Sequence, residues 1–279
     1  MGLGGEPVGE RMVIAFCGKG GVGKTSLSAL AVRLMLEGGR RVLAVDADPS
    51  MGLSLALGLR PRRTLDHLRR EMVEALRGKP QDRVDLAASL DYKLLEILEE
   101  RGCLAFLAVG RPEEEGCYCR LNSFLREAIE ALSYRFQVVV IDAEAGLEQV
   151  NRRVMRSVTH LALVSDASAK GIRVAEDLAE LALRAVSPEK MGLVFNRLAG
   201  KEVFQVLSSR THLPVLGWVP EEPEIARYDR EALSLLDMPA NPALQALEEC
   251  ILGSGFLETS EADACSPQGT GGWAPETTL

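Results

Sequence analysis

Residues 18–25 of the chain read GKGGVGKT, between a short apolar run and a helical pattern. The string matches the phosphate-loop pattern GxxxxGK[ST] and stands where that loop must stand, after a strand and opening a helix. Glycines let the backbone approach a polyphosphate, and the helix N-terminus adds a favourable dipole. We expect Lys24 to reach the β- and γ-phosphates and the Thr25 hydroxyl to ligate Mg²⁺. The predicted contacts of this loop with a nucleotide are Gly18, Gly20, Gly21, Val22, Gly23, Lys24, Thr25 and Ser26.

Short apolar runs alternate with helical stretches on both sides of this loop. The runs lie at 12–18, 41–45, 104–109, 136–141, 161–164, 191–195 and 214–219, and the amphipathic stretches at 24–37, 121–133, 147–158, 169–186 and 202–209. Continuous apolarity is typical of strands that are buried on both faces. The sequence therefore predicts a three-layer α/β/α fold around a mostly parallel, doubly wound sheet of about seven strands.

The organisation along the chain indicates one domain with extended ends. Residues 12–252 are predicted to form a single P-loop domain, with helices and loops at 59–102 inserted after the second strand. Residues 1–11 are Gly-rich and predicted to be flexible, and residues 253–279, rich in Gly, Ser, Thr, Glu and Pro, are predicted to be disordered.

Composition excludes several classes of protein. Lys and Arg number 32 against 40 Asp and Glu, a net charge of −8, and no long basic run occurs, which argues against a nucleic-acid binder. No apolar stretch approaches the roughly 18–20 residues that span a bilayer, and the N-terminus does not resemble a signal peptide. Six cysteines in 279 residues are too sparse for a disulfide scaffold. We therefore expect a cytoplasmic protein that binds neither membranes nor nucleic acid.

Lys19, the second residue of the loop, indicates which class of P-loop protein the chain resembles. KGGVGKT resembles the deviant Walker A motif of the MinD/ParA/nitrogenase-iron-protein ATPases. The resemblance implies an ATP-sandwich homodimer in which this lysine crosses the interface to the partner's phosphates. VDADPS at 45–50 resembles the class's switch I, where Asp48 would orient the attacking water. VVVIDAEAGLE at 138–148 resembles Walker B running into switch II, with Asp142 on the magnesium side.

The same resemblance predicts which residues contact the base of the nucleotide. Asn196, in GLVFNRL, matches the asparagine that reads adenine, with Arg197 beside it, and Pro220 and Glu221 match a second adenine-contacting segment. A plain turn-forming role for Asn196 stays open. No Asn/Thr-Lys-x-Asp guanine signature follows this strand, which favours ATP over GTP.

Cys117 and Cys119, in GCYC, are the residues that distinguish a subfamily. One residue between two thiols suits a soft divalent or cuprous ion, and a twofold dimer would bring four thiolates together. Two small buried side chains near a turn are the alternative. The other cysteines, Cys17, Cys103, Cys250 and Cys265, have no ligand spacing, and Cys17 is expected in the core.

The order of these motifs from about residue 12 to 251 resembles the carbon monoxide dehydrogenase accessory ATPases, the CooC family. DAEAGLEQV and GWVPEEPEIARYD are close to that family's switch II and C-terminal nucleotide segment. The resemblance implies an ATP-hydrolysing metallochaperone that binds Ni²⁺ or Zn²⁺ at Cys117 and Cys119 across a dimer. Its client would be carbon monoxide dehydrogenase or a related nickel enzyme. Arg120-Leu121 replaces the family's usual Pro-Glu after the second cysteine.

Two other classes remain open. MinD/ParA-like positioning ATPases would carry a basic C-terminal amphipathic helix, whereas the segment after Gly253 contains no Lys or Arg. An iron–sulfur reductase-like protein would carry a cysteine near switch II, and residues 142–150 contain none.

Overall fold

The computed structural model describes residues 12–77, 92–110, 132, 135–143, 158–185, 188–257 and 265. The predictions for residues 1–11, for Cys117 and Cys119, for almost all of the helices at 121–133 and 147–158, and for most of the C-terminal segment lie outside these residues.

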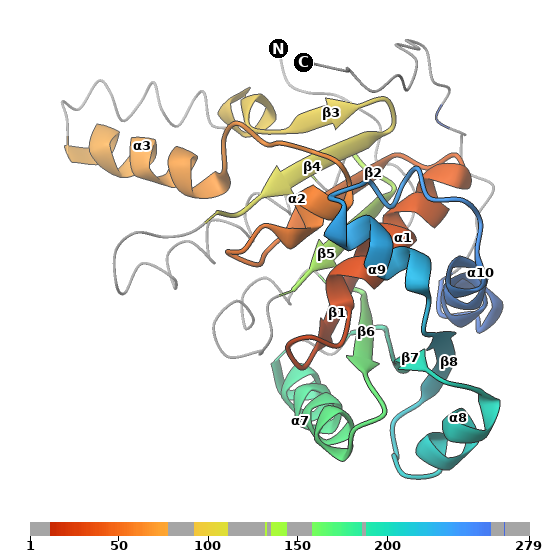
Figure 1. Ribbon diagram of the computed structural model, residues 1–279. Helices are drawn as coiled ribbons and strands as arrows, with labels where there is room; N and C mark the ends of the chain where they lie inside the picture. Colours follow the sequence, from red (N-terminus) through yellow and green to blue (C-terminus); the bar gives the residue numbers. More distant parts are fainter. Residues whose placement is uncertain are drawn as a thin grey trace.

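The centre of the described chain is an eight-stranded sheet in the order β3-β4-β2-β5-β1-β6-β7-β8 (Figure 1). Its strands are β1 (Met12–Gly18), β2 (Val42–Asp46), β3 (Glu99–Arg101), β4 (Leu104–Ala108), β5 (Val138–Asp142), β6 (His160–Ser165), β7 (Lys190–Leu198) and β8 (Val215–Pro220). Neighbouring strands pair in parallel except β3 with β4. The seven predicted strands are confirmed. The added strand, β3, is a short charged edge strand that gives no apolar signal.

Helices cover both faces of this sheet. They are α1 (Lys24–Glu37), α2 (Gly52–Ala56), α3 (Leu65–Arg77), α7 (Ala169–Ala185), α8 (Lys201–Ser208), α9 (Pro223–Arg230), α10 (Pro242–Glu248) and the π-helix η2 (Glu249–Gly253). Alternate residues of β1 belong to different cores. Val13 and Cys17 pack in a cluster with residues of α7, whereas Ile14 and Phe16 pack in a cluster with residues of α1 and α10. The three-layer prediction is therefore confirmed.

Parallel pairing brings three strand ends to one edge of the sheet. β5 lies between β2 and β1, and Asp142 at its end is in register with Asp46 of β2 and Phe16 of β1. The chain runs from β1 to one side of the sheet and later returns to its other side as β6. This topological switch point is where open α/β sheets bind ligands.

Two features of the C-terminal region differ from the sequence analysis. Phe256 and Leu257 are buried in the core, so the packed domain extends past the predicted boundary at residue 252. Cys103 and Cys265 form a disulfide across a sequence separation of 162, although the sparse cysteines gave no reason to expect one. The Cys265 amide also donates to the Gly39 carbonyl oxygen over 2.7 Å. Cys17 and Cys250 are buried free thiols, as predicted for Cys17.

The described helices include none that is long and apolar enough to cross a membrane.

Candidate nucleotide site

The loop between β1 and α1 can be built only with glycines at key positions. A Cβ on Gly18 would lie 2.2 Å from the Val164 carbonyl oxygen, because β6 runs against it. Gly21 and Gly23 have φ of +82° and +92°, a region that L side chains rarely adopt. Gly23 is the N-cap of α1 and has no side chain to bond the first helical N–H groups. These groups are therefore available to an anion.

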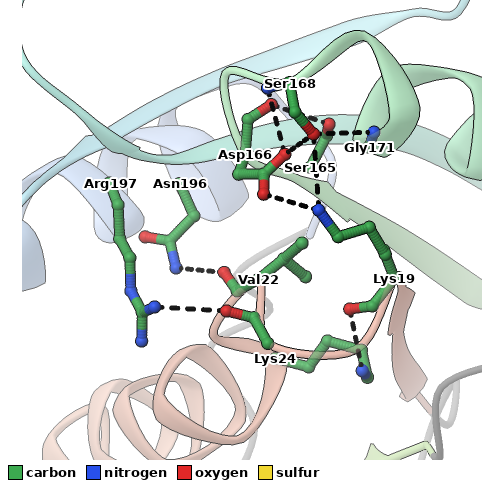
Figure 2. A network of polar contacts seen from close by, with 10 residues as sticks. Lys19, Val22, Lys24, Ser165, Asp166, Ser168, Gly171, Asn196 and Arg197 are labelled. Carbon is green, nitrogen blue, oxygen red and sulfur yellow. Dashed lines mark hydrogen bonds and ion pairs between the residues drawn. The ribbon is translucent and has the colours of Figure 1, made fainter.

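The two lysines of the loop are held by different partners. Lys24 is 8% exposed, and its Nζ donates to the Lys19 carbonyl oxygen over 3.3 Å. Lys19 Nζ instead lies 2.9 Å from Asp166 Oδ2, at the end of β6 (Figure 2). A buried ammonium whose partner is a neutral carbonyl has capacity left for an anionic ligand. Lys24 is thus placed as a phosphate ligand requires.

A hydrogen-bonded carboxylate lies under the start of α1. Thr25 Oγ1 donates to Asp142 Oδ2 over 2.6 Å, and Ser28 Oγ donates to Oδ1 over 3.3 Å. Burial raises the pKa of Asp142 to about 6, although the Thr25 hydrogen bond and the charge of Lys24 oppose the rise. The structure therefore brings together Thr25 and Asp142, which are 117 residues apart in sequence.

Asp46 is a site residue that the sequence analysis missed. It is fully buried, and its Oδ2 accepts hydrogen bonds from the amides of Leu53 (2.9 Å) and Ser54 (3.2 Å) in α2. Its Oδ1 accepts from the Asp48 amide over 3.2 Å. Burial, and then the charge of Asp142, raise the pKa of Asp46 to about 7. Asp46 thus fixes the backbone around Asp48, and the signal for it was a second carboxylate at the strand end in VDAD.

Asp48 lies on the rim of the site. It is half-buried, its Oδ1 accepts the Ser50 amide over 2.8 Å, and it lines the same cavity as the phosphate loop. This hydrogen bond within a tight turn holds the carboxylate in place without burying it.

The donor set fits a hard cation. The Thr25 hydroxyl and the carboxylates of Asp142 and Asp48 offer only oxygen, which Mg²⁺ prefers. The described residues include no cluster of three or more His, Cys, Asp or Glu side chains suited to hold a metal. In phosphate sites Mg²⁺ is bound by one or two protein groups together with phosphate oxygens and water.

A cavity of about 320 Å³ opens beside the loop. Its lining residues outside the loop come from switch I, α2, β7 and the region around α9, and they are Asp48, Gly52, Leu55, Ala56, Arg197, Tyr228, Asp229, Ala232, Leu233 and Leu235. Tyr228 and Asp229 end the segment GWVPEEPEIARYD, which the family resemblance had already assigned to the nucleotide. The rest of this wall, Ala232, Leu233 and Leu235, was missed by the sequence analysis, because these residues belong to no recognisable motif.

The predicted base-reading residues are only partly brought to this cavity. Asn196 is 4% exposed and its Nδ2 donates to the Val22 carbonyl oxygen over 2.8 Å (Figure 2). Arg197 lines the cavity, and its Nη1 donates to the Gly21 carbonyl oxygen over 3.1 Å. Pro220 ends β8, and Glu221 follows it with its amide bonded to Leu198. Asn196, Pro220 and Glu221 are not among the described residues that line the cavity.

Backbone strain gathers around the same site. Among the described residues, three non-glycine residues have positive φ: Met51 (55°), Arg197 (59°) and Ala232 (52°). Met51 precedes α2, and the other two line the cavity. Such conformations cost about 1–3 kcal/mol each and cluster at ligand sites.

A phosphate loop at the switch point of a parallel sheet, with a buried lysine and a hydroxyl bonded to a carboxylate, defines a P-loop nucleotide-binding protein. Residues 13–235 match the family described as CbiA, the CobQ/CobB/MinD/ParA nucleotide binding domain. The chain belongs to this family and is a nucleotide-binding ATPase of the MinD/ParA type.

Three similar proteins span nearly the whole domain. An uncharacterized ATP-binding protein of Methanocaldococcus jannaschii is 34% identical over 237 residues, covering 82% of this chain and 92% of the relative. The carbon monoxide dehydrogenase accessory protein CooC of Rhodospirillum rubrum is 27% identical and covers 81% of this chain and 90% of its own. The structure of the septum site-determining protein MinD of Pyrococcus horikoshii OT3, complexed with Mg-ADP, has a TM-score of 0.66 at 22% identity. It covers 86% of this chain and 94% of that one. The likeness to this MinD structure is evidence for the fold alone.

Proposed function

We propose that the chain is an ATP-hydrolysing metallochaperone that dimerises with bound ATP and delivers nickel to a carbon monoxide dehydrogenase or acetyl-CoA synthase type enzyme in the cytoplasm. The observation that carries the ATP part is the Thr25–Asp142 hydrogen bond beneath a glycine-built phosphate loop. The metal part is supported by the similarity to the Rhodospirillum rubrum accessory protein and by the Cys117-Tyr118-Cys119 sequence.

Hydrolysis in this site is attack of water on the γ-phosphate, and the protein contributes positioning and charge. Lys24 would neutralise the β- and γ-phosphates from its buried position, and the free N–H groups of α1 would hold their oxygens. Asp48 would orient the attacking water from the rim. Mg²⁺, held by Thr25 and backed by Asp142, would supply charge neutralisation between the β- and γ-phosphates.

The adenine would lie in the cavity between the loop and α9. Arg197 and Tyr228 offer a planar cation and an aromatic ring on its walls. The buried Asn196 would then act on the base or by supporting the loop through Val22. Pro220 and Glu221 would form a second base-contacting segment, as the family resemblance implies.

Dimerisation is the step that ATP would control. Lys19 would leave its own chain and contact the phosphates that the partner holds. Light scattering on Asp48→Ala with Mg-ATP should show a dimer, and the further change Lys19→Ala should return it to a monomer. A monomer with bound ATP under every condition would exclude the sandwich arrangement.

The metal site is tested by stoichiometry. Cys117 and Cys119 from two chains would give four thiolates, so a calorimetric titration should show one Ni²⁺ or Zn²⁺ per two chains. Cys117→Ser with Cys119→Ser should abolish this binding and leave ATP affinity intact. Cys103→Ser with Cys265→Ser is the matched control, because it removes as many sulfur atoms from the disulfide and should leave metal binding unchanged. One ion per chain that survives the first pair of changes would overturn the shared site.

A second candidate is a MinD/ParA-like positioning ATPase, favoured by the structural likeness to MinD. An ATPase activity stimulated by anionic vesicles, with no metal binding at Cys117 and Cys119, would support it instead. The iron–sulfur alternative has no cysteine in residues 142–150 to support it.

A further inference from the structure

The ammonium of Lys19 is held by its own chain. Its Nζ lies 2.9 Å from Asp166 Oδ2 and 3.4 Å from Ser168 Oγ, both in the turn between β6 and α7 (Figure 2). The side chains of Lys19 and Asp166 are 27% and 32% exposed, so the ion pair lies at the surface beside the phosphate loop. The other loop lysine, Lys24, makes no such ion pair in the described structure and is bonded to a carbonyl.

The carboxylate that holds Lys19 is itself fixed in direction. Asp166 Oδ1 accepts the Ser168 amide over 3.1 Å and the Ser168 hydroxyl, which leaves Oδ2 directed at Lys19. Burial acts to raise the pKa of Asp166, but the hydrogen bonds from Ser168 and Lys19 outweigh it and hold the pKa below its usual value. The aspartate is therefore ionised and oriented before any partner arrives.

A glycine makes this arrangement possible. A Cβ on Gly171 would lie 2.4 Å from Asp166 Oδ1 and 2.6 Å from Ser165 Oγ, so the first turn of α7 can close on the carboxylate only without a side chain there. The Gly171 amide donates to Ser168 Oγ over 3.0 Å and completes the network.

We infer that Asp166 is a positioning residue that restrains Lys19 in the separate protomer and so weakens nucleotide-dependent dimerisation. The inference rests on the proposed function, because it assumes that Lys19 must leave its own chain to reach the partner's phosphates. An ammonium bound to Asp166 has to give up that ion pair before it can cross an interface. The restraint keeps protomers apart until the partner's phosphates offer a stronger anion.

The expected change in dimer affinity follows from the partial exposure of the Lys19–Asp166 ion pair and from the twofold symmetry of the dimer. A partly exposed ion pair changes the equilibrium constant of the process that breaks it by a factor of about three. A twofold dimer breaks two such pairs, one in each chain, so removing them tightens the dimer about tenfold.

The test is the dimer dissociation constant, measured by sedimentation equilibrium with Mg²⁺ and adenylyl imidodiphosphate. Asp166→Asn keeps the size of the side chain and removes its charge, and it should dimerise about tenfold more tightly than the unchanged chain. Ser168→Ala, which removes only the hydroxyl that orients Asp166, should act in the same direction and carries the test if Asp166→Asn fails to fold. Asp177→Asn is the matched control, because it breaks an exposed ion pair with Arg173 elsewhere on α7 and should have no effect.

The outcomes separate this inference from the proposed dimerisation. If the unchanged chain dimerises and Asp166→Asn does so equally or more weakly, the restraint is wrong and the proposed function stands. If the unchanged chain and both variants stay monomeric with nucleotide bound, the restraint and the dimerisation are both wrong. Tighter dimerisation of Asp166→Asn, with Asp177→Asn unchanged, supports the restraint.

Discussion

Replacing Thr25 with valine removes the hydroxyl that donates to Asp142 Oδ2 over 2.6 Å and keeps the shape of the side chain. Asp142 is 1% exposed, so water cannot easily replace the lost donor. A hydrogen bond to a charged group contributes about 1.5–3 kcal/mol. Since one pKa unit corresponds to about 1.36 kcal/mol, the pKa of Asp142 should rise by about 1–2 units. Its present value of about 6 already exceeds the ordinary 3.8 because of burial.

The sign of the pH dependence is fixed by these values. In the unchanged protein, folded Asp142 keeps a proton that the unfolded chain releases between pH 4 and 6, so its contribution to the free energy of unfolding falls as pH rises through that window. Thr25→Val extends the fall to about pH 7–8. The variant should therefore be less stable by about 1.5–3 kcal/mol at pH 8 and by much less at pH 5.

Urea unfolding of the nucleotide-free protein at pH 5 and pH 8 measures this difference directly. Thr25→Ser keeps the hydroxyl and is the matched control, so its loss of stability should be small and nearly independent of pH. An equal loss of stability at both pH values in Thr25→Val would show that the effect comes from packing and not from the ionised carboxylate.

Other predictions concern the phosphate loop, switch I and the disulfide. Lys24→Ala should weaken ATP binding about 100-fold in a fluorescent-nucleotide titration, since it removes a buried charge at the phosphates, whereas Asp48→Ala should bind ATP normally and lose turnover. Equal losses of affinity in the two variants would show that Asp48 is misassigned. Gly23→Ala should also reduce ATP affinity, because φ is +92° there, and normal affinity with an unchanged melting temperature would contradict the loop geometry. Cys103→Ser with Cys265→Ser should lower the free energy of unfolding by about 2–5 kcal/mol, as for closure of a long loop. An unchanged urea midpoint would contradict that.

The sequence predicted those parts of the molecule that are determined by residues close together in the chain. Apolar runs gave seven strands, and the spacing of Gly18, Lys24 and Thr25 gave the phosphate loop, because backbone approach to phosphate restricts residue types at fixed positions. Asp142 could be placed at a strand end, but only the register with β2 shows that it lies beside the buried Asp46.

Other features depend on contacts between segments far apart in the chain. The disulfide joins residues 162 apart, and the wall of the cavity comes from the region of α9, neither of which leaves a periodic pattern. Likewise, only the packing of the β6–α7 turn against the loop shows that Asp166 holds Lys19. The sequence motif therefore predicts the role of Lys19 and Lys24 toward phosphate, whereas only the fold shows which groups of this chain each lysine contacts.

We propose that ATP joins two chains and that the joined chains share one metal ion at Cys117 and Cys119. Native mass spectrometry of Asp48→Ala with Mg-ATP and Ni²⁺ measures the stoichiometry in one experiment. We expect a species with two chains, two nucleotides and one nickel ion, which loses only the nickel in the Cys117→Ser, Cys119→Ser protein. Nickel bound to single chains, or a nucleotide-bound dimer that never takes up metal, would contradict it.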